Sequence, residues 1–246
     1  MQARGQPGQP AGGTCRTAQT IVDSVVRQLP AIRRSRDGLA PRPQAVPART
    51  LTRPAARRAD ERPDRIVAAA ARWIQDGKRL DMQGLAEELG VSRVTLFRRV
   101  GSREALLGKA LWILTQCMLE TAAARWEAER PARELHTPGT GRYINAMVAR
   151  SKGLRRLLED EPALAMRVLT DPRGQVQAGV VAFVEDLLRR DIEEFGLVTL
   201  IDPDALAYAL VRLGESFLYA DVLAARKPDV ETANRLQRAL IEGILP

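Results

Sequence analysis

The sequence predicts an all-α fold, on three observations. From Pro63 to the C-terminus, apolar residues recur at helical spacing. No segment alternates apolar and polar residues over the length of a strand. The breaks between periodic segments fall at proline, glycine or serine, the residues that begin and end helices. With 45% hydrophobic residues, the chain can bury a substantial core.

Residues 1–60 have a different composition. They are rich in proline, glycine and alanine, and they contain eleven arginines, no lysine and three aspartates. Such a segment buries too little apolar surface to offset its ordering entropy, so we expect a disordered tail with at most a short helix at 21–29. The tail's net charge of +8 equals that of the whole chain, so residues 61–246 are neutral overall. A start codon assigned too far upstream would also produce this abrupt change.

The helices that follow the tail have recognisable ends. Pro203 suits a first helical position with Asp202 as its cap, and Gly90 suits a helix end. Ser92 and Ser102 can each cap the helix that follows them. The helices are predicted to span residues 63–77, 82–89, 92–99, 102–130, 140–151, 153–170, 174–195, 203–225 and 228–245.

Metal, cofactor and membrane functions find little support in the composition. Cys15 and Cys117 are too few for a disulfide framework or a zinc site. His136 is the only histidine, and we expect it in a loop because Thr-Pro-Gly follows it. We therefore expect no metal and no cofactor. No apolar run approaches 18 residues and no signal peptide is visible, so we expect a cytoplasmic protein without a membrane partner.

The most informative segment is LAEELGVSRVTLFRRVGSREALL, residues 85–107. Ala86 is small where two helices cross, Gly90 can adopt positive φ in a tight turn, and Leu96 can pack back between the helices. The second helix would then expose three arginines, as contact with the DNA major groove requires. Residues 62–109 carry ten basic and six acidic side chains, so positive charge gathers around this pair of helices.

With a preceding helix from Arg65 to Gln75 and the stretches TLFRR and GSREALL, residues 62–110 resemble the DNA-binding domain of the TetR family. The resemblance implies a helix-turn-helix domain at 61–108 and a helical effector-binding and dimerisation domain at 109–246. It also implies a homodimer that binds a double-stranded DNA operator, most simply as a repressor, and a small-molecule effector that releases it. An activator of the same fold stays open, as does an enzyme or scaffold with an appended helix-turn-helix.

The same resemblance assigns roles to individual side chains. The residues implied to face bases are Gln83, Arg93, Val94 and Arg98. Those implied to contact the DNA backbone are Ser92, Thr95, Phe97, Arg99, Ser102 and Arg103. Phe97 departs from the common tyrosine and can contribute packing only, and Arg103 stands where many members have lysine. For any single arginine, a solvated helix face is the alternative.

The predicted helix 203–225 carries two apolar stripes, so it must be covered from more than one side. In the TetR family the last two long helices form a four-helix dimer interface, which would place Gly214, Leu218 and Val222 at the contact. A central helix of a monomer is the alternative.

A polar stripe on this helix suggests an effector site. Tyr208, Arg212, Glu215 and Tyr219 fall within an arc of about 60°. They could line one wall of a ligand cavity, with Trp112, Phe183 and Leu187 on the apolar wall. A solvated strip is the alternative. Residues around 169–188 and 202–222 resemble the QsdR-like branch of the family, which would imply a lactone or acyl effector.

Overall fold

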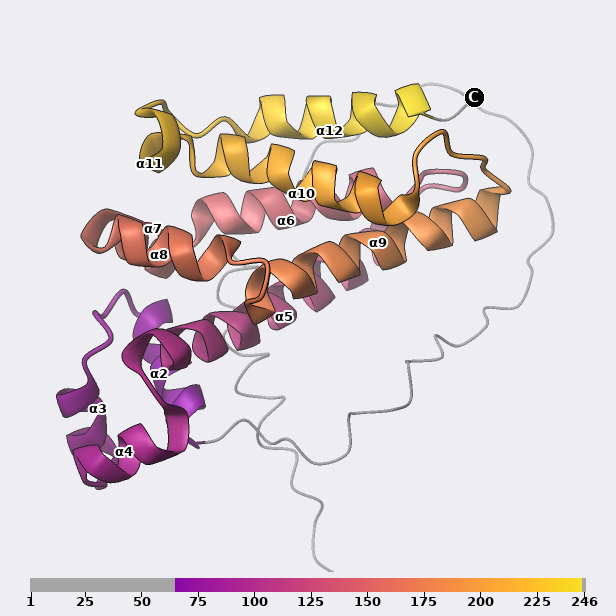
Figure 1. Cartoon of the computed structure of the whole chain (residues 1–246). Coiled ribbons are helices and arrows are strands. Elements are labelled where there is room, and N and C mark those ends of the chain that lie inside the picture. Colours follow the sequence, from indigo (N-terminus) through magenta and orange to yellow (C-terminus); the bar gives the residue numbers. More distant parts are fainter. Residues whose placement is uncertain (1–64, 245–246) are drawn as a thin grey trace, which may run out of the picture. The chain divides into compact units, whose positions relative to one another are not determined.

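A computed structural model describes residues 65–244, and all regular structure within them is helical (Figure 1), which confirms the predicted fold class. The tail predicted for residues 1–60 lies outside the described residues. With the labels of Figure 1, the helices are α2 (Arg65–Gln75), α3 (Met82–Leu89), α4 (Arg93–Val100), α5 (Arg103–Glu129), α6 (His136–Arg150), α7 (Lys152–Asp160), α8 (Pro162–Thr170), α9 (Gln175–Phe195), α10 (Pro203–Leu218), α11 (Ala220–Ala224) and α12 (Val230–Ile244).

The three short helices α2, α3 and α4 gather around the first turns of α5 (Figure 1). We call α2 to α4 with the start of α5 the reading head. Its core holds Ala70 from α2, Leu85 from α3, Leu96 from α4 and Leu106 from α5, all inaccessible to solvent. The same buried cluster continues into α7 and α8, and the predicted domain boundary at residues 108 and 109, inside α5, stays a prediction.

The rest of α5 packs with α6, α9, α10 and α12, which we call the body (Figure 1). Helices α9 and α10 pack against each other along much of their length, and α12 lies on α10 and α6. Leu188, Leu206, Leu210 and Ile241 form the buried contact among α9, α10 and α12. Apolar burial of this kind is the main source of stability for an amphipathic helix.

Helix α6 begins earlier than predicted, and the loop assignment of His136 is wrong. The carboxylate of Asp191 accepts hydrogen bonds from the backbone nitrogens of His136 and Thr137, at 2.6 and 2.9 Å. It thereby satisfies donors that a helix start leaves free. The His136 ring is buried, with Nε2 2.7 Å from Glu194. A cap supplied from a helix 55 residues away in the sequence leaves no local signal.

Two helices predicted as continuous are broken. The predicted helix 153–170 divides at Glu161 and Pro162 into α7 and α8, because a proline cannot donate the hydrogen bond that would continue α7. The predicted helix 203–225 divides at Tyr219 into α10 and α11. The expected first position of Pro203 and the serine caps at Ser92 and Ser102 are confirmed.

Amide side chains fasten α12 to its neighbours. Asn145 of α6 is buried, and its Nδ2 donates to Asn234 Oδ1 at 2.8 Å and to Gln237 Oε1 at 2.7 Å. Gln237 Nε2 in turn donates to the backbone oxygen of Leu210 at 2.9 Å. Buried amides that are satisfied in this way fix the relative position of the helices that carry them.

Candidate nucleic-acid interface

A tight turn joins α3 to α4. Gly90 adopts a left-handed conformation with φ of 65°, and the backbone nitrogen of Val91 donates to the oxygen of Ala86 at 3.0 Å. Leu96 projects from α4 into the core against α3, which fixes how the second helix crosses the first. This is the helix-turn-helix arrangement that residues 85–100 predict.

One face of α4 is buried and the other carries its positive charge. Leu96 and Val100 anchor the helix in the core, whereas all three arginines, Arg93, Arg98 and Arg99, are exposed. Val94 on the same outer face is 76% exposed, which is unusual for an aliphatic side chain in a folded protein. An exposed short helix with three guanidinium groups and no carboxylate suits an anionic partner.

The helix caps of the interface are formed. Ser92 Oγ accepts from the backbone nitrogen of Thr95 at 3.1 Å and lies 2.9 Å from its hydroxyl, so the two hydroxyls bond each other. Ser102 Oγ accepts from the nitrogen of Ala105 at 3.1 Å. The exposed side chain of Gln83 on α3 donates a hydrogen bond to Glu87 at 2.7 Å. Gln83 would have to break this bond to reach a base.

The guanidinium of Arg93 stacks on the exposed ring of Phe97, with 5.5 Å between Cζ and the ring centre. Phe97 therefore supports Arg93 on the outer face of α4, and its predicted packing contact with DNA stays a prediction.

Arg103 is not placed as predicted. Its guanidinium makes a bidentate ion pair with Glu161, with Nη1 2.7 Å from Oε2 and Nη2 in contact with Oε1, and its Nε donates to the backbone oxygen of Leu80 at 2.5 Å. The contact with Arg103 holds the pKa of the Glu161 carboxyl below its usual value. A guanidinium with these partners is engaged inside the protein and would have to leave Glu161 to make the predicted contact with the DNA backbone.

The predicted effector stripe does not form one wall. Arg212 and Glu215 do pair, with Nη1 2.6 Å from Oε2, and Tyr219 is buried close to Glu215. Tyr208, however, is 54% exposed at the surface of α10. Helical spacing still reaches Tyr219, whose backbone nitrogen donates to the oxygen of Glu215 at 2.9 Å, so the stripe is divided by the exposure of Tyr208 and not by the helix end.

Glu215 is the electrostatically unusual member of this group. Burial raises the pKa of its carboxyl to about 7, outweighing the opposing effect of the Arg212 charge. Burial also raises the pKa of the Tyr219 phenol, and the neighbouring Glu215 adds to that effect. Gln177 of α9, with its amide turned to face acceptors, donates to Glu215 Oε1 at 2.7 Å. These residues form a buried polar cluster between α9 and α10.

Sequence reasoning missed Gln177, although a signal existed. Val181, Val184 and Leu188 follow it at four, seven and eleven residues and pack in the body, so Gln177 occupies the apolar stripe of α9. A polar residue in such a stripe is itself an indication of a buried hydrogen-bonding site.

The three apolar candidates for the cavity wall are separated. Trp112 packs so closely on Gly179 that a Cβ there would lie 2.0 Å from its ring, which makes it a contact between α5 and α9. Phe183 packs against a separate buried cluster that includes Leu119 and Trp126 of α5. Leu187 is fully covered by the protein itself.

The predicted dimer contacts are also corrected, because the chain's own core covers them. Leu218 is buried in the cluster that includes the reading head, and Val222 packs against the same cluster. A Cβ at Gly214 would lie 2.9 Å from Gln237 Nε2 of α12. The chain itself thus buries most of the two apolar stripes and leaves Leu213, Phe217 and Val222 partly exposed, a division that sequence alone could not predict.

The comparisons with known proteins agree with this arrangement. Residues 140–242 match the family model described as the Tetracyclin repressor-like C-terminal domain. The solved structure of the Rhodococcus erythropolis transcriptional repressor QsdR, from the TetR family, is similar with a TM-score of 0.64 and 29% identity over 72% of this chain and 93% of that one. Over these residues the chain is similar to the TetR family of transcriptional regulators.

Another solved structure is less similar to this chain. A crystal structure described as a TetR-family regulator from Rhodococcus sp. is 18% identical over 73% of this chain and 95% of that one, with a TM-score of 0.41. No curated protein matches the chain.

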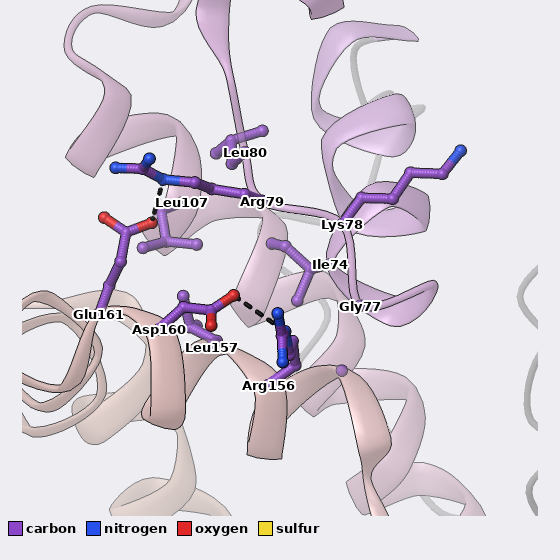
Figure 2. A pocket seen from close by; sticks show the side chains of 11 residues that line it. Ile74, Gly77, Lys78, Arg79, Leu80, Leu107, Arg156, Leu157, Asp160 and Glu161 are labelled. Carbon is purple, nitrogen blue, oxygen red and sulfur yellow. Dashed lines mark hydrogen bonds and ion pairs between the residues drawn. The ribbon is translucent and has the colours of Figure 1, made fainter.

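A small crevice of this chain lies where α7 meets the reading head (Figure 2). Ile74, Leu107 and Leu157 form its apolar floor, and Arg79, Asp160 and Glu161 are among its polar rim residues. Its volume of about 10 Å³ holds about one water molecule. Ligand pockets usually enclose roughly 300–1,000 Å³, so this crevice is not an effector site.

Two further features, a membrane span and a metal cluster, are absent from residues 65–244. No helix there combines the length and apolar character needed to cross a membrane. Within the same residues, no group of three or more metal-ligating side chains comes together.

Proposed function

We propose that this chain is a ligand-responsive repressor of the TetR type, which binds a near-palindromic operator as a homodimer and leaves it when a small molecule binds the body. The observation that carries the proposal is the exposed arginine face of α4, held on the core by Leu96 and Val100. The similarity to QsdR, a transcriptional repressor, supports repression over activation.

Within this proposal, Arg93, Val94 and Arg98 read base edges, because they share the outer face of α4. Gln83 reads an adjacent base from α3. The residues assigned to the DNA backbone are Ser92, Thr95, Phe97, Arg99 and Ser102, which lie on or beside α4 and the start of α5. Free backbone N–H groups at the starts of α4 and α5 would add to phosphate binding.

The homodimer would form through the outward face of α10. Ala205, Tyr208, Ala209 and Ser216 are all exposed there, at spacings that place them on one side of the helix. Small side chains allow a second helix to approach closely, and an exposed tyrosine is typical of interfaces. A two-fold dimer would present two α4 helices to the two halves of a palindrome.

Replacing Ala209 by arginine should therefore yield monomers, because the long charged side chain would stand in the contact. Ala163→Arg is the matched control, since Ala163 is equally an exposed alanine but lies on α8. Sedimentation at micromolar concentration would show a dimer for the wild type and the control only. A wild type that sediments as a monomer would contradict the proposed dimer.

The effector would be oriented by the polar cluster of Glu215, Gln177 and Tyr219, with Arg212 beside it. A buried amide, a neutral carboxyl and a phenol offer donors and acceptors to the carbonyl of a lactone or acyl compound. Leu187 and Phe183 of α9 and Trp112 of α5 remain candidates for its apolar surroundings.

The central experiment is selection of bound fragments from genomic DNA, followed by a screen of acyl lactones of different chain length for release. Tyr219→Phe and Arg212→Ala should leave operator affinity nearly intact and blunt release, whereas Tyr208→Phe, on the surface, should respond like the wild type. Equal release of all three variants would remove the effector site from this cluster and leave the DNA-binding proposal standing.

A further inference from the structure

Glu161 receives two arginines at the corner between α7 and α8. It pairs with Arg103 through both oxygens, and Arg79 Nε lies 3.2 Å from its Oε1 (Figure 2). Its backbone is fixed as well, since its nitrogen donates to Leu157 at the end of α7 and its oxygen accepts from Ala165 in α8, both at 2.9 Å. The carboxylate is only 15% exposed.

Arg103 connects this corner to the segment before α3 and to the segment after α4. It is the first residue of α5, separated from the end of α4 by Gly101 and Ser102. Its Nε donates to the oxygen of Leu80, the buried residue that precedes the cap of α3. One guanidinium thus joins the segment that enters the helix-turn-helix, the segment that leaves it, and α7–α8.

The other end of α7 is fixed by close packing. A Cβ at Gly153 would lie only 2.0 Å from the backbone oxygen of Ile74, so α7 begins in direct contact with the end of α2. A helix of nine residues that is attached at both ends defines an orientation as well as a distance. The close packing at Gly153 resists separation of α7 from α2. The bidentate pair of Glu161 with Arg103 resists rotation of α7 relative to the start of α5, because such a pair has a fixed geometry.

We propose that Glu161 is a positioning residue for operator binding, which acts through Arg103 and Arg79 to set the orientation of the reading head on the body. The inference rests on the proposed homodimer, because the orientation of each head then sets the separation of the two α4 helices. Glu161 does not contact the DNA. Loss of the Glu161 carboxylate would leave each α4 helix intact and make the separation of the two α4 helices in the dimer less well defined.

Loss of the carboxylate also frees two guanidinium groups for phosphates. Glu161→Gln should therefore lower affinity for the operator and not for non-specific DNA, which a general weakening of the fold could not do. Asp160→Asn is the matched control, because Asp160 is the next residue and pairs only within α7, with Arg156 at 3.0 Å. Arg103→Lys keeps the charge but cannot form the bidentate pair.

The probes are a duplex selected by the wild-type full chain from a randomised library, the same duplex with one or two base pairs inserted between its half-sites, and a scrambled duplex. Fluorescence anisotropy should show that the wild type and Asp160→Asn bind the selected duplex at least tenfold more tightly than the inserted ones. Glu161→Gln and Arg103→Lys should reduce this ratio to about threefold or less, with unchanged or higher affinity for the scrambled duplex.

The outcomes separate the two proposals. A wild type that selects no sequence refutes the proposed function itself. A wild type that selects a palindrome, together with Glu161→Gln and Arg103→Lys that keep its spacing discrimination, overturns the role of Glu161. If melting shows that Glu161→Gln is partly unfolded, Arg103→Lys decides, since affinity lost equally for all duplexes would mean a structural role only.

Discussion

At the scale of single residues, Glu215 gives the clearest dependence on pH. Burial raises its pKa to about 7 from an ordinary 4.5, so the fold favours the neutral carboxyl. The stability gained in this way is complete below about pH 4.5 and is lost as the pH rises through 7. Glu215→Gln keeps the neutral shape, so its advantage over the wild type should grow from pH 5 to pH 8, to at most about 3 kcal/mol.

Urea unfolding at several pH values measures this difference. Glu161→Gln is the matched control of opposite sign, because contact with Arg103 lowers the pKa of Glu161 and its stabilisation is present at neutral pH and lost in acid. A gap between Glu215→Gln and the wild type that does not change with pH would contradict the burial of an ionisable carboxyl.

Two neighbouring arginines of α4 should differ in what they contribute to DNA binding. Arg98→Ala should cost about 1–3 kcal/mol on the operator and relax the base preference, if its guanidinium bonds a guanine through two atoms. Arg99→Ala should weaken all sequences more evenly and reduce the salt dependence, because a phosphate contact releases counterions. Titrations of operator and scrambled duplexes at two salt concentrations distinguish these effects, and a double variant with wild-type affinity would refute the assignment of α4.

For single residues, the sequence predicted which side chains are exposed better than it predicted which side chains pair with each other. The arginines of α4 are exposed as expected, and the two serine caps are formed. Arg103 was placed on DNA because the family resemblance carries no information about Glu161, which lies 58 residues away. A long-range ion pair depends on how two helices are brought together, and periodicity within either helix does not report it.

At the scale of helices and turns, Gly90 allows a clean test of backbone strain. A Cβ at Gly90 would meet no atom within 4 Å, so Gly90→Ala can destabilise only through its positive φ, by about 1 kcal/mol. Gly141 is the matched control, because a Cβ there is equally free of contacts but its backbone is helical in α6. Gly141→Ala should stabilise by roughly 0.5–1 kcal/mol, and denaturant unfolding that gives both variants the same sign would contradict this account.

Helix boundaries were predicted where a proline or cap residue marks them and missed where the cause is remote. Pro162 was a local signal for the break after α7, and it was overlooked within a strong apolar pattern. The start of α6 at His136 depends on the carboxylate of Asp191, and the end of α10 at Tyr219 has no proline or glycine to mark it. Apolar spacing reports that a face is buried, and it does not report which element covers it.

At the scale of the whole molecule, the basic residues 1–60 should add affinity without specificity. Their net charge of +8 attracts any duplex, whereas the described helices carry the residues proposed to read bases. A chain that begins at Asp60 should keep its sequence preference and lose part of its salt-dependent affinity. Binding isotherms on operator and scrambled duplexes would show this as a shallower salt slope for both, and a loss of sequence preference would contradict it.

The attachment of α12 through Asn145, Asn234 and Gln237 has a practical consequence, because none of these three side chains carries a charge. Added salt screens ionic contacts and leaves neutral amide bonds nearly unaffected. The buried fastening of the C-terminal helix should therefore persist across the range of ionic strength over which a duplex dissociates. A loss of DNA binding during a salt titration should therefore not arise from weakening of these amide contacts of α12.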